Sequence, residues 1–281
     1  MSMLGRLRRL QRWPQGLAGL IIILFFVFNA VFPQVLAPYD PYDLVGRPFV
    51  KPNAQFILGT NDIGQDILSE LIWGSRVSIT VGIAAGFLTV LGGLLAGVVA
   101  GYLGGTVDRV IMRFVDVVLV IPFLPLMILL ASFIGPSFRT LIFVIAVTSW
   151  AAPSRVIRAQ TLSVKQEMYV DAAQAMGAKG SHVIIRHIIP NVLPLSLAQF
   201  IGATGGAILT EAALSFLGLG DPTAKSWGVM LQFAQARGAF FSGAWLWWVI
   251  PPGLCIAAAT VGFALFGLVV EEILDPRLQR R

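Results

Sequence analysis

The chain has 281 residues, of which 57% are hydrophobic and 12% are charged, and its mean hydropathy is +0.81. Soluble domains are about 45–50% apolar and about 25% charged, so this composition excludes a soluble protein and indicates an integral membrane protein. The net charge of +6 does not indicate a nucleic-acid partner, because no run of Lys and Arg alternates with aromatic residues on a polar domain. The single cysteine, Cys255, excludes an internal disulfide.

The first predicted membrane span covers residues 17–36, a nearly pure apolar run of 20 residues that follows four arginines within residues 1–13. This length is sufficient to cross a hydrocarbon core of about 30 Å. A cleaved signal peptide is the alternative, but no small-x-small cleavage site closes the run, which ends in Phe32-Pro33-Gln34. We therefore expect residues 1–16 to be a cytoplasmic segment and residues 17–36 to be an uncleaved first transmembrane helix.

Residues 37–76 follow as a polar, proline-rich segment, which predicts an extracytoplasmic loop with one short amphipathic helix over 66–73. Five further spans are predicted within residues 77–271, and residues 272–281 form a tail. The five spans are expected at 77–101, 117–135, 140–157, 193–217 and 245–270, with kinks at Pro122 and Pro125 in the second of them.

The positive charges predict the orientation of these six spans. With both termini and the loops at 102–116 and 155–192 placed in the cytoplasm, 14 of the 20 Lys and Arg residues lie inside. The sequence therefore predicts an all-α integral membrane protein with six transmembrane helices and cytoplasmic termini.

Residues 168–194 are the longest polar-bearing interlude in the second half of the chain. Residues 171–176 have a helix-forming composition, and Gly177 is a natural helix stop. A second helix is predicted from Ser181 to Ile189, ending before Pro190. Its histidines, His182 and His187, are too few for a metal site without carboxylate ligands.

The spacing within this segment resembles the EAA loop of ABC-importer permeases, in which Glu-Ala-Ala is followed by three residues and Gly, and then by Ile and Pro seven and thirteen residues after the Gly. Asp171 stands where that family usually has Glu. The resemblance implies a type I ABC importer permease fold, in which segment 165–192 is a coupling loop that docks on a separate ATPase subunit. An ordinary loop between membrane helices is the alternative. The implied coupling residues are Asp171, Ala172, Ala173, Gly177, Ile184 and Pro190.

Three further stretches resemble the second permease subunit of the dipeptide/oligopeptide/nickel group of ABC importers. Residues 58–66 are similar to a Leu-Gly-Thr-Asp-x-x-Gly-Arg-Asp signature, from which Asn61 and Gln65 depart. The other two are residues 210–220 and the Asp275-Pro276-Arg277 ending. This resemblance implies a plasma-membrane complex with a second permease, two ATPase subunits or domains and an extracytoplasmic substrate-binding protein. Di- or oligopeptides are the expected substrate, and nickel and oligosaccharides are alternatives.

No catalytic or nucleotide-binding motif accompanies these features. The sequence contains no Gly-Lys dipeptide and therefore no Walker A loop, and it has no GxSxG, HExxH or CxxC pattern. We expect a transport subunit that is not itself an enzyme and holds no cofactor or metal, with ATP and Mg on the partner subunits. An ion-gradient-driven secondary transporter is the alternative class, but such proteins usually show internal repeats and several intramembrane ionisable groups.

Glu211 is the one acidic residue expected deep in a span. A charged side chain at the bilayer centre costs about 2.5–3.5 kcal/mol on insertion scales. Two interpretations follow: Glu211 lines the translocation path, or it is a packing residue satisfied by a local hydrogen bond.

Overall fold

The computed structural model describes residues 14–274, and every regular element in this range is a helix. The N-terminal arginines and the Asp275-Pro276-Arg277 ending lie outside the described residues. The elements are α2 (Pro14–Val31), α3 (Pro33–Leu36), α4 (Ile67–Leu103), α5 (Gly105–Val120), α6 (Phe123–Ile134), α7 (Phe138–Ser149), α8 (Ala151–Lys165), α9 (Met168–Ala175), α10 (Gly180–Val183), the π-helix η1 (Ile184–Ile188), α11 (Ile189–Phe216), α12 (Trp227–Ala236), α13 (Ala239–Ser242), α14 (Trp245–Trp248) and α15 (Ile250–Leu274).

The long helices are those of a membrane protein. Four helical stretches are long and apolar enough to cross a bilayer, at 14–31, 67–103, 180–216 and 245–273. Two bent pairs, α5 with α6 and α7 with α8, raise the number to six if each pair forms one span. The all-helical membrane architecture is thereby confirmed for the described residues. The first span is shorter than predicted, because Pro33 ends α2 and starts the separate short helix α3.

The second span is longer than predicted. α4 has 37 residues and includes most of the segment 66–73, which we expected to form a separate helix. Asp66 caps this long helix, since its carboxylate accepts a hydrogen bond from the backbone N–H of Ser69 at 2.8 Å. No proline interrupts the helix before Gly104, where φ is +67° and the helix ends. At 1.5 Å per residue the helix is about 55 Å long and exceeds the hydrocarbon core.

The segments predicted as the third and fourth spans are each interrupted by a bend. The predicted loop at 102–116 is mostly helical as part of α5, and the chain then turns by 90° at Ile121-Pro122 before α6. Ile121 is extended, as the residue before a proline prefers. The fourth span bends by 46° at Trp150 and continues as α8 beyond its predicted end at residue 157.

Two ion pairs join α5 to α8. The guanidinium of Arg158 donates two hydrogen bonds of 2.5 Å to the Asp108 carboxylate, and Arg155 donates one of 2.5 Å to Asp116. The exposed side chains of α5 include Val110, Phe114 and Val117.

The prediction that the second polar-segment helix ends before Pro190 was wrong. α10, η1 and α11 form one continuous helical stretch from Gly180 to Phe216. The turn before Pro190 is a π-turn, in which the N–H of Ile189 donates to the carbonyl of Ile184, five residues earlier. We attribute the continuity to this wider turn, because it loosens the helix next to a residue that has no N–H to donate.

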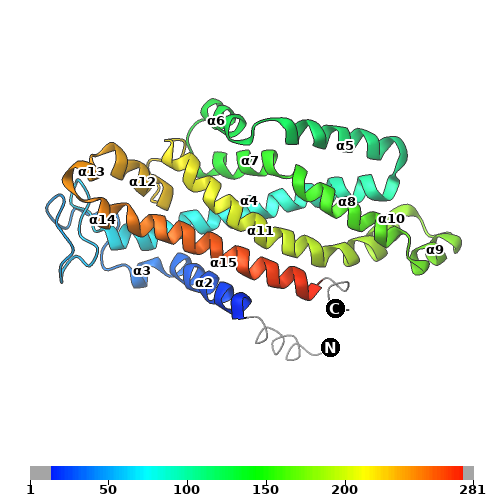
Figure 1. Ribbon diagram of the computed structural model, residues 1–281, viewed down its shortest axis with the longest axis horizontal. Coiled ribbons are helices and arrows are strands. Elements are labelled where there is room, and N and C mark those ends of the chain that lie inside the picture. Colours follow the sequence, from blue (N-terminus) through cyan, green and yellow to red (C-terminus); the bar gives the residue numbers. More distant parts are fainter. Residues whose placement is uncertain (1–13, 275–281) are drawn as a thin grey trace.

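α4 lies at the centre of the helix bundle and contacts α8, α11, α7 and α2 (Figure 1). Glycines on α4 allow the neighbouring backbones to approach closely, as is common between helices in lipid. The tightest contact with α8 is at Gly97, where an added Cβ would lie 2.7 Å from the Ser154 carbonyl oxygen and 2.9 Å from the Arg158 nitrogen. Backbone atoms cannot move away as a flexible side chain can, so the α4–α8 contact depends on this glycine.

We therefore expect Gly97→Ala to destabilise the protein by about 1–3 kcal/mol, because overpacking forces the two helices apart. The measurement is the thermal midpoint of the purified protein in mild detergent. Gly253→Ala is the matched control, because a Cβ there meets no atom within 4 Å and alanine is the better helix former. An unchanged midpoint for Gly97→Ala would contradict the proposed packing constraint.

Candidate functional site

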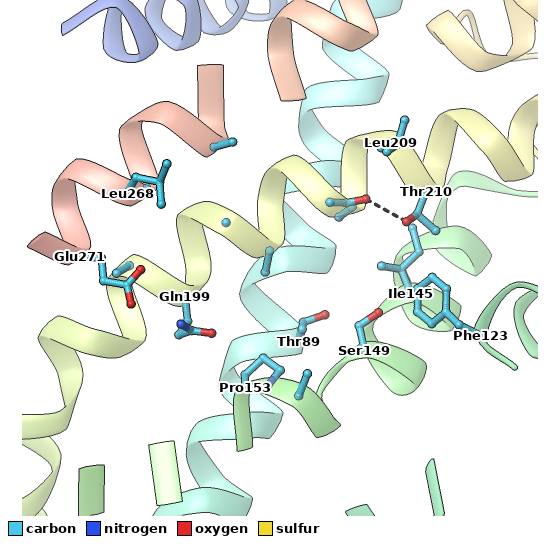
Figure 2. A pocket seen from close by; sticks show the side chains of 18 residues that line it. Thr89, Phe123, Ile145, Ser149, Pro153, Gln199, Leu209, Thr210, Leu268 and Glu271 are labelled. Atoms are coloured by element: carbon cyan, nitrogen blue, oxygen red, sulfur yellow. Dashed lines mark hydrogen bonds between the residues drawn. The ribbon is translucent and has the colours of Figure 1, made fainter. Parts of the chain in front are cut away.

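A cavity of about 710 Å³, open at the surface, lies between α4, α6, α7, α8, α11 and α15. Figure 2 shows that side chains from separate helices surround it, with Thr89 from α4, Ser149 from α7 and Gln199 from α11. Most of the wall is apolar or small. Its polar side chains are Thr89, Ser149, Gln199, Thr210 and Glu271.

One of these polar groups is not used by the fold itself. The hydroxyl of Thr89 is buried and has no hydrogen-bond partner among residues 14–274. Thr210 instead donates to the carbonyl of Gly206 in its own helix at 2.8 Å, the bond drawn in Figure 2. A cavity with a mainly apolar wall and a few polar groups is suited to a ligand that passes or binds weakly.

The sequence interpretation did not single out this wall. The signal is present in α11, where Gln199, Gly202, Gly206 and Thr210 recur at intervals of three or four residues and all line the cavity. Such a stripe of small and polar residues on one helix face is informative in a segment that is otherwise apolar. The contributions of Thr89 and Ser149 come from other helices and depend on how these pack.

Glu211 belongs to the same helix but does not line the cavity. It is 1% exposed, and its carboxylate accepts hydrogen bonds from Ser215 in its own helix at 2.8 Å and from Ser78 of α4 at 3.0 Å. Both carboxylate oxygens therefore have partners within this chain. Of the two interpretations of Glu211, this geometry favours the packing residue.

The predicted coupling segment forms a defined corner at one end of the bundle, where α9 and α10 lie (Figure 1). α9 ends in a Schellman motif: the N–H of Ala178 donates to the carbonyl of Ala173 at 3.1 Å, and that of Gly177 donates to Gln174 at 2.9 Å. Gly177 has a φ of +85°. Since an added Cβ there would meet no atom within 4 Å, the requirement for glycine is the backbone conformation and not space.

The six predicted coupling residues are not equally accessible. Asp171, Ala172, Gly177 and Pro190 are exposed, Ile184 is half-buried, and Ala173 is only 6% exposed. Ala173 therefore faces its own chain. The surface offered by this corner also includes two methionines that the sequence interpretation did not name, Met168 at 86% and Met176 at 83% exposure. Flexible, polarizable methionines are common at surfaces that bind other proteins.

The corner is attached to α4 as well as to α8. Lys165, the last residue of α8, donates a hydrogen bond of 2.7 Å to the carbonyl of Tyr102 and lies over the Tyr102 ring. On the other side, Tyr169 of α9 lies beside His187 of η1, with ring centroids 6.0 Å apart. No group of three or more His, Cys, Asp or Glu side chains in residues 14–274 could hold a metal ion.

Comparison with known proteins agrees with this architecture. The family model described as "Binding-protein-dependent transport system inner membrane component" matches residues 93–280, and the N-terminal transmembrane domain of oligopeptide transport permease C matches residues 5–57. The chain therefore belongs to the family of binding-protein-dependent transport system inner membrane components, the membrane permeases of ABC importers. It is a multi-pass membrane protein of a family whose members carry no ATPase site of their own.

Individual relatives align along nearly the whole chain. The dipeptide transport system permease protein DppC of Bacillus subtilis is 34% identical over 275 residues, covering 97% of this chain and 85% of the relative. The probable D,D-dipeptide transport system permease protein DdpC of Escherichia coli is 36% identical, and the alignment covers 94% of this chain and 88% of the relative. The oligopeptide transport system permease protein OppC of Bacillus subtilis is 33% identical, and the alignment covers 94% of this chain and 86% of the relative.

Two variants distinguish the role of the cavity wall in transport from the role of Glu211 in packing. We expect Gln199→Leu to lower substrate uptake at least about threefold, because it removes the amide from the cavity wall, with an unchanged thermal midpoint. Glu211→Gln should lower the midpoint, because it weakens the bonds from Ser78 and Ser215, with near-normal uptake per assembled complex. The measurements are the initial uptake rate and the thermal midpoint. Altered uptake by Glu211→Gln at normal stability would instead support a role in the path.

Proposed function

We propose that this chain is one of two permease subunits of an ATP-driven importer of di- and oligopeptides. The observation that carries the substrate class is the alignment over nearly the full chain with permeases named for dipeptides and oligopeptides. The match of residues 5–57 to the N-terminal domain of oligopeptide transport permease C supports the same assignment.

In this proposal each bent helix pair counts as one span, which gives six spans with both termini in the cytoplasm. The distribution of Lys and Arg supports this orientation. The α9–α10 corner then lies on the cytoplasmic side, where it contacts one of two ATPase subunits or domains. The second permease completes the translocation path, and an extracytoplasmic binding protein delivers the substrate at the opposite end of the bundle.

The connection between the corner and the cavity suggests how the motion is transmitted. The stretch 180–216 begins at the corner and carries Gln199 and Thr210 in the cavity wall. A displacement of the corner upon ATP binding is therefore passed along one helix to the path. The same displacement also acts on α8, which precedes α9 and contributes Pro153 to the wall. Two helices thus link the ATPase contact to the cavity, and closure of the ATPases would move both.

The test is reconstitution of the complete importer in proteoliposomes with ATP and the binding protein. We expect ATP-dependent uptake of a labelled di- or tripeptide, which unlabelled peptides inhibit and nickel or oligosaccharides do not. Co-purification from the native membrane should recover a second permease and ATPase chains. Uptake of nickel or an oligosaccharide in place of peptides would refute the substrate class. Transport by this chain alone, driven by an ion gradient, would refute the mechanism.

Gly177 provides a test of the coupling corner. We expect Gly177→Val to reduce uptake about tenfold or more while ATP hydrolysis continues, because a β-branched residue strains the left-handed conformation that ends α9. Gly177→Asn is the control, because asparagine tolerates that conformation and should retain most of the uptake. Full coupling in Gly177→Val would show that the corner does not transmit the motion.

A further inference from the structure

A second cavity, of about 340 Å³, lies at the end of the bundle opposite the α9–α10 corner, near α12 and α14 (Figure 1). Its wall combines the 37–66 segment, the start of α4, residues 222–237 and Trp248. One part of the wall is apolar, with Val229, Met230, Phe233 and Trp248. The charged part holds two acids and two bases, Asp62, Glu70, Lys225 and Arg237.

Two of these charges are used by the fold. The ammonium of Lys225 is paired with the carboxylate of Glu70 and donates a second hydrogen bond to Oε1 of Gln65 at 2.8 Å. Asn61 donates to the same Gln65 oxygen at 2.9 Å and to Glu70 at 3.2 Å. Asn61 and Gln65, the two departures from the peptide-permease signature, therefore belong to a buried network that holds the loop against α4. A ligand could not take partners from this network without breaking it.

Two other polar groups in the wall lack such partners. The Asp62 side chain is 16% exposed and forms only a loose ion pair with Arg237, whose Nε lies 3.6 Å from Oδ2 of Asp62, beyond hydrogen-bond distance. Trp248 is 1% exposed, and its indole N–H has no hydrogen-bond partner in the same range. A buried N–H without a partner costs free energy comparable to a lost hydrogen bond.

These groups define the ligand that would satisfy them. The Asp62 carboxylate requires a donor, and a cationic donor gives the stronger bond. The Trp248 N–H requires an acceptor, such as a carbonyl oxygen. Arg237, whose side chain is 60% exposed, forms a loose ion pair with Asp62 and lies at the rim, where it can meet a carboxylate when a ligand's ammonium takes its place on Asp62. A protonated amine, a carbonyl and a carboxylate in one small molecule describe an unblocked short peptide.

We propose that this cavity binds short peptides by their free N-terminus. Asp62 receives the terminal ammonium, Trp248 donates to the first carbonyl, and Arg237 faces the C-terminal carboxylate. The volume lies at the low end of ligand pockets, about 300–1,000 Å³, which restricts the bound part to a few residues. This inference rests on the proposed peptide-import function and deepens it: the permease, and not only the binding protein, selects for an unblocked N-terminus at the entrance of the path.

The experiment measures peptide binding to the assembled importer in lipid nanodiscs without the binding protein, by isothermal titration calorimetry. The probes are trialanine and N-acetyl-trialanine. We expect saturable binding of trialanine and at least about tenfold weaker binding of the acetylated form, because acetylation removes the charge that Asp62 recognises. Asp62→Asn should weaken trialanine binding by a similar factor and abolish the discrimination between the two probes. Trp248→Phe should weaken both probes alike.

Asp43→Asn is the matched control, because Asp43 is an exposed acid of the same loop that does not line the cavity, and it should bind as the unaltered protein does. If Asp62 has only a structural role, Asp62→Asn will not change the ratio of trialanine binding to N-acetyl-trialanine binding. Equal binding of the two probes, no saturable binding, or an Asp62→Asn effect confined to affinity for the binding protein would overturn the proposal.

The failure of this proposal is distinguishable from failure of the peptide-import function. With binding protein and ATP added, continued peptide uptake by the unaltered complex together with any of those outcomes refutes only the N-terminus site. Absence of peptide uptake by the unaltered complex refutes the function on which the site rests.

Discussion

The fold depends on the close approach of α4 to the helices around it. In lipid, helices gain little from the hydrophobic effect on association, so contact between backbones and satisfied polar groups must hold them together. α4 provides both. Gly97 brings its backbone against α8, and Ser78 reaches the Glu211 carboxylate of α11. At its extracytoplasmic start in the proposed orientation, Glu70 pairs with Lys225. One long helix thereby fixes the position of both helices that lead away from the coupling corner.

That arrangement explains how a fold with few polar groups can connect two distant surfaces. α8 and the 180–216 stretch are held against α4 along their lengths, so they have limited freedom to move independently. The π-turn at 184–188, next to Pro190, and Pro194 inside α11 are the exceptions within 180–216. π-turns and prolines are the usual places where helices bend, and both of these lie between the corner and the cavity wall. In the proposed mechanism, bending is therefore confined to the part of the helix nearest the ATPase.

The sequence predicted features that depend on local chemistry, and it did not predict those that depend on packing. The apolar runs predicted the all-helical membrane architecture, and Gly177 was correctly expected to end a helix, because a left-handed residue is a local requirement. The breaks at Pro122 and Trp150 changed the course of two spans, and a proline shows where a bend can occur but not its angle. Ala173 was expected to face a partner subunit, but it is buried within its own chain. The residue type and its spacing alone do not show which way an alanine faces. The unpartnered groups Thr89 and Trp248 were identifiable only once their neighbours were known.

The ion pairs between α5 and α8 have a consequence for how the membrane accommodates this chain. An amphipathic helix with one apolar face, such as α5, would by itself lie flat at the surface of a bilayer. Asp108 and Asp116 are two helical turns apart and bind Arg158 and Arg155, so both the tilt of α5 and its rotation about its own axis are fixed relative to α8. Its apolar face is then presented sideways, to acyl chains or to a neighbouring subunit. The ion pairs thus add to hydropathy in setting the orientation of this helix.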